Sequence, residues 1–333
     1  GFFTTWAQSY SKGTVVGVAG TANIFSLNNT SEAYIGEGAQ VNQDPAYRST
    51  DQRVSVEAAN DTQTMNLSGV FGLKGVGTSG GKTGIGGAYL QVNYTSSTSA
   101  QIKKDARVYA ESLSVKACSS DRNISIAESG GVADQYSLNG TFSLLKTDVT
   151  TLAQVEDGAQ VQANRGIVDE NGDGVIDGDE NANVFIDAEG DSQLYNIAGG
   201  ITKGKNVGIG ASISINEIER NTKALVGNED GSGGGTLSSQ GNIKVRASSG
   251  GQISSWSLAA ALAVDTPSYS ASDDPLDGVS LPILFGDVKS GISIAGDASV
   301  NNLSGITEAA IINGSVACAG DVTLAAVSDS SID

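Results

Sequence analysis

An internal repeat constrains the fold of this chain more than any other feature of its sequence. A small anchor residue, Gly or Ala, is followed thirteen positions later by Ala, and two positions after that by Ile or Val. The five copies are Gly20, Ala33 and Ile35; Gly87, Ala100 and Ile102; Gly140, Ala153 and Val155; Ala211, Ala224 and Val226; and Gly296, Ala309 and Ile311. A constant offset in every copy is typical of stacked repeats, in which each unit buries its apolar residues against its neighbours.

A second piece follows each copy and alternates aliphatic residues with other residues before it ends in Ala. Its copies are Val54, Val56 and Ala58; Leu113, Val115 and Ala117; Val184, Ile186 and Ala188; Ile243, Val245 and Ala247; and Val322, Leu324 and Ala326. Alternation with a period of two indicates a strand with one buried face. Gly-rich runs such as Val207–Gly210 precede several anchors, and we expect their small side chains to let successive coils approach closely.

The repeats differ in length, because successive anchors are 67, 53, 71 and 85 residues apart. The extra residues fall between the recurring pieces, at Gln43–Arg53, 166–183 and 265–289. A solenoid accommodates such insertions at the corners of its coils while the stacked strands stay in place. We therefore predict an all-β fold, a parallel β-helix (β-solenoid) of about five imperfect repeats. It is expected to run through residues 1–333 as one segment of a longer array, and to be right-handed by the general preference of parallel crossovers.

Composition agrees with thin, stacked strands and limits the classes of partner. Gly accounts for 44 of 333 residues and aromatic residues for only 5%, while apolar residues reach 39%, which is enough to drive folding. The net charge is −18 and no run is rich in Lys or Arg, so the sequence predicts no binding to nucleic acid. The longest apolar runs, such as Leu258–Val264, are too short for a transmembrane helix.

Two strings carry a resemblance to a known class of protein. Residues Thr30–Val41 read TSEAYIGEGAQV, and residues Val54–Ala58 read VSVEA. They resemble the repeats of very large filamentous adhesins of Gram-negative bacteria, the haemagglutinin-like and leukotoxin-type surface proteins. The resemblance extends over almost the whole chain. It implies a right-handed parallel β-helix exported to the bacterial cell surface, where it would act as a stalk, adhesin or matrix fibre.

The insertion at 166–183 contains a twelve-residue pattern typical of a calcium-binding loop, DENGDGVIDGDE, from Asp169 to Glu180. The expected ligands are Asp169, Asn171, Asp173, Val175 through its carbonyl oxygen, Asp177 and Glu180. No helical pattern flanks the loop, so we predict that Ca²⁺ acts as a structural clip and not as a sensor. The alternative is an acidic, solvated insert. Two further acidic stretches, Asn228–Asp230 and 273–277, are interpreted as solvated loops.

The two cysteines and the two tryptophans are assigned to packing. With about 20 residues per coil and a rise of about 4.8 Å, Cys118 and Cys318 would lie roughly 45 Å apart, so we predict buried free thiols. An intermolecular disulfide is the alternative. Trp6 and Trp256 are interpreted as packing residues or corner plugs. Asn residues shortly after the anchors, such as Asn216, are placed in turns.

Catalysis is disfavoured because the chain contains no His, the commonest general base. The leading hypothesis is therefore a structural, adhesive segment that is not an enzyme and that associates head to tail with neighbouring repeats or other copies. A second hypothesis is a module that binds surface glycans or host proteins through the inserts Gln43–Arg53 and 265–289. The third is a β-helix enzyme that degrades polysaccharide, which requires a cleft with two close carboxylates.

Overall fold

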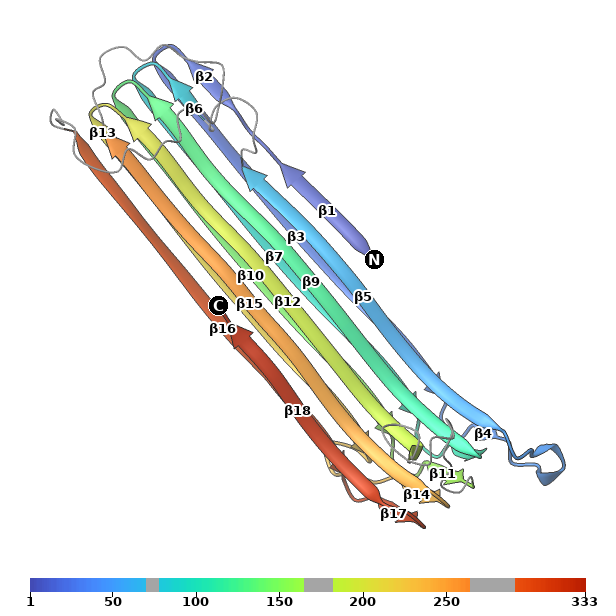
Figure 1. The fold of residues 1–333 in the computed structure, drawn as a ribbon. Coiled ribbons are helices and arrows are strands. Elements are labelled where there is room, and N and C mark those ends of the chain that lie inside the picture. Colours follow the sequence, from blue (N-terminus) through green and yellow to red (C-terminus); the bar gives the residue numbers. More distant parts are fainter. Residues whose placement is uncertain (70–77, 165–181, 264–290) are drawn as a thin grey trace, which may run out of the picture.

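The computed structural model describes residues 1–69, 78–164, 182–263 and 291–333, and this part of the chain is almost entirely β-structure. Long strands form two large parallel sheets and short strands form a third (Figure 1). A single turn of 3-10 helix, η1 (Pro45–Tyr47), lies in the insert Gln43–Arg53. No helix within the described ranges has the length and hydrophobicity that a membrane span requires.

The three sheets have a simple order. Sheet A contains β1 (Phe2–Ala7), β5 (Arg53–Gly69), β9 (Ser112–Ala133), β12 (Ala182–Gly204), β15 (Asn242–Ala263) and β18 (Val322–Ile332), with the short β2 (Ser11–Gly13) and β6 (Thr78–Gly80) beside them. Sheet B contains β3 (Val16–Ile35), β7 (Thr83–Ile102), β10 (Tyr136–Val155), β13 (Val207–Val226) and β16 (Ile292–Ile311). Sheet C contains β4 (Gln40–Val41), β8 (Arg107–Ala110), β11 (Gln160–Ala163), β14 (Thr236–Ser239) and β17 (Ser315–Cys318).

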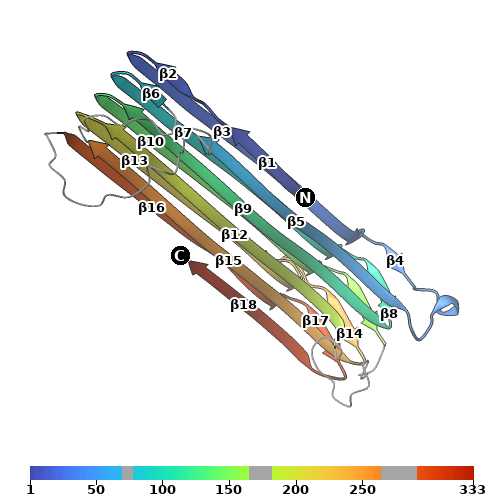
Figure 2. The same cartoon turned by 45° about the horizontal axis from the view of Figure 1, so that its top comes forward.

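The chain passes through sheets B, C and A in turn, and each such circuit is one coil. The first coil consists of β3, β4 and β5, and the next begins with β7. Every strand pairing is parallel, and equivalent strands of successive coils lie side by side (Figure 2). The fold is therefore a parallel β-helix, as the sequence predicts.

The register confirms the repeat alignment residue by residue. Gly20 pairs with Gly87, Gly87 with Gly140, and the row continues through Ala211 to Gly296. The alternating triplets also stack in register: Val56, Val115, Ile186, Val245 and Leu324 form one row across sheet A. The constant offset of thirteen holds because each anchor and its Ala-x-Ile or Ala-x-Val piece lie on one uninterrupted strand.

The coils are much larger than the expected 20 residues. The sheet B strands are 20 residues long, and a full circuit takes as many residues as the spacing between anchors. This corrects the separation of the cysteines, because Cys118 in β9 and Cys318 in β17 are three coils apart, or roughly 14 Å along the solenoid axis. Both thiols are free but half-buried, and so the prediction of full burial is wrong.

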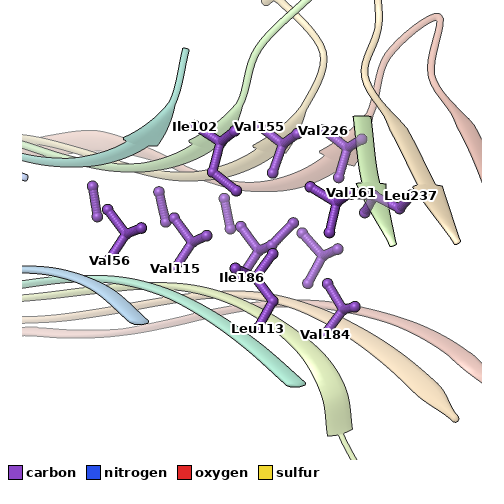
Figure 3. Packing of buried hydrophobic residues seen from close by; sticks show 14 of the residues in the cluster. Val56, Ile102, Leu113, Val115, Val155, Val161, Val184, Ile186, Val226 and Leu237 are labelled. Carbon is purple, nitrogen blue, oxygen red and sulfur yellow. The ribbon is translucent and has the colours of Figure 1, made fainter. Parts of the chain in front are cut away.

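An aliphatic core fills one end of each coil, next to sheet C. Leu113, Val184 and Ile243 from sheet A are almost completely buried against Ile102 and Val155 from sheet B. In Figure 3, Leu113 and Val184 of sheet A face Ile102 and Val155 of sheet B, and Val161 and Leu237 of sheet C lie at the end of the core. Stacked rows of Val, Ile and Ala supply most of the buried apolar surface.

Towards the opposite end of each coil, the space between sheets A and B contains small and polar side chains. A Cβ atom on Gly208 would lie 2.8 Å from the carbonyl oxygen of Leu262, and one on Gly210 would lie 2.9 Å from that of Ala260. The Gly-rich runs therefore allow the two facing sheets to approach closely. At Gly86, a Cβ atom would also collide with the side chain of Asn139 in the next coil, so close approach of successive coils, which the sequence suggested, contributes at this position.

Buried amides connect the sheets near the middle of the long strands. Asn196 of β12 donates to Ser214 (2.8 Å) and Asn216 (2.6 Å) of β13, and it accepts from Ser143 of β10 (3.1 Å). Asn216 thus lies inside a long strand, and its expected placement in a turn is wrong. These hydrogen bonds satisfy groups that would otherwise be buried without partners.

Candidate functional site

The calcium loop and two of the inserts fall outside the described residues. Asp169, Asn171, Asp173, Val175, Asp177 and Glu180 all belong to this part of the chain, as do 265–289 and the acidic stretch 273–277. Of the insert predicted at 166–183, Ala182 and Asn183 already belong to β12. Among the described residues, no three Asp, Glu or Cys side chains gather as metal ligands would.

The acidic side chains of the loop Asn228–Asp230 bind to residues close to them in the sequence. Glu229 forms an ion pair with Lys223, and the Asp230 carboxylate accepts a hydrogen bond from the backbone N–H of Ser232 (2.9 Å). Hydrogen bonds from the side chain and the backbone of Ser232 lower the pKa of Asp230. This geometry agrees with the interpretation as a solvated loop.

One buried carboxylate lies between the large sheets. Asp121 of β9 accepts hydrogen bonds from the Tyr94 hydroxyl of β7 and from Ser119 (3.1 Å). Burial, which disfavours the charged form, raises the pKa of Asp121 to about 6 even though both hydroxyls favour the carboxylate. Burial and the neighbouring Asp121 charge also raise the pKa of Tyr94.

A small cavity of about 10 Å³ adjoins Asp121, which is room for about one water molecule. It is lined partly by the hydroxyls of Thr147 and Ser192, neither of which has a hydrogen-bond partner. The cavity is far too small for a sugar ring. Sequence reasoning missed this cluster, although counting alternate positions from Leu113 places residue 121 on the inward face.

A second buried carboxylate lies on the outer face of sheet A. Arg246 of β15 donates two hydrogen bonds to Asp187 of β12 (2.8 and 2.9 Å), and Lys116 of β9 lies 3.7 Å away on the other side. These three residues are neighbours in register, so opposite charges alternate along the stack. Asp187 and Asp121 point to opposite faces of sheet A and form no catalytic pair.

The first corner insert, Gln43–Arg53, is held against the solenoid by one arginine. The Arg48 guanidinium lies 3.6 Å from the centre of the Tyr109 ring and donates to the carbonyl oxygens of Asn42 and Gln43 (3.0 Å each). The strands that flank 265–289 end at the opposite end of the coil, roughly 65 Å away. The two inserts proposed as one binding surface therefore emerge at opposite ends of the molecule.

Both tryptophans lie on the outer face of sheet A, in one row with Leu67, Ile126 and Ile197. Trp6 is 63% exposed and Trp256 is 54% exposed, so neither plugs a corner. Sequence reasoning missed this row, although apolar residues alternate along its strands, as at Ile124 and Ile126.

The outermost coils leave the aliphatic core open at both edges. Leu113, Val184 and Ile243 are at most 2% exposed, whereas Val322, in the same row of the last coil, is 43% exposed. Within the described chain, β3 and β16 are the edge strands of sheet B. Each edge therefore presents unpaired backbone groups beside exposed apolar side chains.

Comparisons with known proteins identify no relative: no family model, no curated protein and no solved structure matches this chain.

Proposed function

We propose that this chain is a structural, adhesive segment of an extracellular bacterial surface fibre or stalk. Its coils associate head to tail, either with further coils of the same chain or with another copy. It has no enzymatic activity in this proposal, and the resemblance of its repeats to filamentous surface adhesins supports the extracellular location.

The open edge carries the head-to-tail part of the proposal. The inward side chain of Leu324 in β18 is 44% exposed, whereas Val245, its neighbour in the same row, is fully buried. A further coil would cover this row and pair with the free side of β18. An edge that is parallel, flat and apolar is an efficient template for another strand.

Calcium is part of the same proposal. We propose that Asp169, Asn171, Asp173, Val175, Asp177 and Glu180 bind Ca²⁺ as a corner clip, in a millimolar affinity range suited to an extracellular medium. Support comes from the loop pattern and from the insertion point between β11 and β12, where a clip would connect sheet C to sheet A.

The test of head-to-tail stacking compares two neighbouring substitutions. Leu324→Lys places a charge on the inward, open edge, whereas Thr323→Lys places the same charge on the outward side of the same strand. We expect the wild type and Thr323→Lys to form particles that lengthen with concentration in electron micrographs, and Leu324→Lys to form none. Equal lengths for all three proteins would contradict head-to-tail association.

A further inference from the structure

The outer face of sheet B is divided into an apolar half and a polar half. The apolar half, hereafter the apolar patch, comprises the outward residues of the first nine positions of each sheet B strand. Its five rows are Val16, Thr83, Tyr136, Val207, Ile292; Val18, Ile85, Leu138, Ile209, Ile294; Gly20, Gly87, Gly140, Ala211, Gly296; Ala22, Tyr89, Phe142, Ile213, Ala298; and Ile24, Gln91, Leu144, Ile215, Val300. The patch contains no charged residue.

These side chains are exposed even in the central coils. Ile85 is 42% exposed, Leu138 is 39% exposed and Ile213 is 43% exposed. The opposite, inward side of these segments carries Ser, Thr, Asn and Gly in β10 and β13, so this half of the central coils is polar inside and apolar outside. Its hydrophobic side chains can be buried only by something that lies outside the coil.

The area of the patch matches what a stable dimer requires. Nine residues along each of five strands, at about 3.3 Å per residue and 4.8 Å between strands, cover roughly 700 Å². A standard protein interface buries about 800 Å² on each partner, and patches of this size on a monomer mark interaction sites. The patch is therefore large enough to hold a second protein surface.

The third row of the patch forms a furrow. A Cβ atom on Gly140 or Gly296 would meet nothing within 4 Å, and neither residue has a positive φ. Neither the backbone conformation nor a contact within the chain therefore requires glycine at these two positions. The row beside it forms a ridge that includes Tyr89 and Phe142, whose rings stack with centroids 5.6 Å apart.

We propose that the apolar patch binds the same patch of a second copy, so that two solenoids pair laterally through sheet B. A two-fold axis parallel to the solenoid axis, between the second and third rows, places each copy's Leu138 row over the other's glycine furrow. The first row then faces the fourth, and the fifth row lies at the rim of the contact. This arrangement makes the contact isologous.

Charge also favours the second copy as the occupant. The polar half of the same face carries acidic side chains such as Glu217 and Glu219 in β13. With the two-fold axis in the patch, the polar halves extend in opposite directions and do not meet. Sheet A is less suitable, because Glu128 and Lys203 interrupt its outer face at this end of the coil.

The test uses the full chain carrying Leu324→Lys, which blocks head-to-tail stacking, so that any remaining association is lateral. Leu138→Lys is compared with Thr150→Lys, which lies on the outward, polar half of the same strand. In a second pair, Gly140→Phe fills the furrow, and Gly36→Phe changes a glycine outside the patch whose Cβ would also meet nothing within 4 Å. Dimerisation is measured by sedimentation velocity under reducing conditions.

We expect the background protein, Thr150→Lys and Gly36→Phe to dimerise with the same Kd. For Leu138→Lys and Gly140→Phe, we expect Kd to rise by about tenfold or more, with unchanged circular dichroism and melting temperature. A monomeric background protein would overturn the proposal, as would equal Kd values for Leu138→Lys and Thr150→Lys. Neither outcome depends on head-to-tail stacking, because Gly140 and Leu138 lie in the middle coil, away from both edge strands.

Discussion

Replacing Asp121 by Asn is expected to stabilise the protein at neutral pH and to leave its stability almost unchanged in acid. In the folded protein, burial between the sheets raises the pKa of Asp121 from 3.8 to about 6. The folded state therefore holds this proton more tightly than the unfolded state. The resulting stabilisation is fully present below about pH 3.8 and is lost as the pH rises through about 6. At about 1.4 kcal/mol per pKa unit, the ionised carboxylate destabilises the fold by about 3 kcal/mol above pH 7.

The assay is urea unfolding between about pH 3.5 and 8 on the wild type, Asp121→Asn and the exposed control Asp134→Asn. Subtracting the wild-type free energy of unfolding at each pH cancels the other carboxylates. For Asp121→Asn, the difference should grow by about 1.4 kcal/mol per pH unit between the two pKa values, 3.8 and about 6, and level off at about 3 kcal/mol at higher pH. Asp134→Asn controls for the removal of one negative charge from the surface. A pH-independent difference for Asp121→Asn, or a difference that shrinks as the pH rises, would refute the reasoning.

Three further predictions concern the outer ion pairs, the core and calcium. Asp187→Ala should lower the free energy of unfolding by about 2 kcal/mol, because it leaves Lys116 and Arg246 without their shared partner. The control Glu189→Ala removes an exposed partner of Lys116 and should change the free energy of unfolding by less than about 0.5 kcal/mol. Both variants are measured by urea titration. Ile186→Val should lower the free energy of unfolding by about 1 kcal/mol and Ile186→Ala by about 3 kcal/mol, since this side chain is fully buried in the aliphatic core. Thermal or urea unfolding measures both, and equal losses would show that the surrounding side chains collapse into the space. Excess chelator should lower the melting temperature of the wild type but not that of Asp169→Ala with Glu180→Ala, as measured by circular dichroism, and an equal shift in both proteins would rule out the loop as the calcium site.

Much of the strand pairing could be predicted from the sequence, because the recurring pieces stay in phase on continuous strands. The Gly20 row and the Val56 row are paired in the structure as the alignment of repeats requires. The alternation of Val54, Val56 and Ala58 also identifies the inward face correctly, since Val56 and Ala58 are at most 6% exposed. Local sequence patterns were therefore sufficient to predict the strands and their inward faces wherever the inward residues are apolar.

The size of the coil was not predictable in this way, because the hydrophobic signal changes face halfway along each strand. In β10, Leu138 points outward and Asn139 inward, whereas Ala153 and Val155 near the other end point inward. Pattern reasoning therefore divides a 20-residue strand into shorter pieces separated by turns. The Asp121 cluster was missed for a related reason, since an isolated acid in a polar stretch gives no periodic signal.

The breadth of the coil determines what a longer assembly of this kind is suited to do. Each circuit uses 53 to 85 residues but advances the structure by only about 4.8 Å, which is less than 0.1 Å of length per residue. A narrow coil of about 20 residues would gain about 0.24 Å per residue. What this chain produces instead is a wall roughly 65 Å wide, with a continuous sheet on either side. Such a structure provides a large lateral surface for contacts but little length along the solenoid axis.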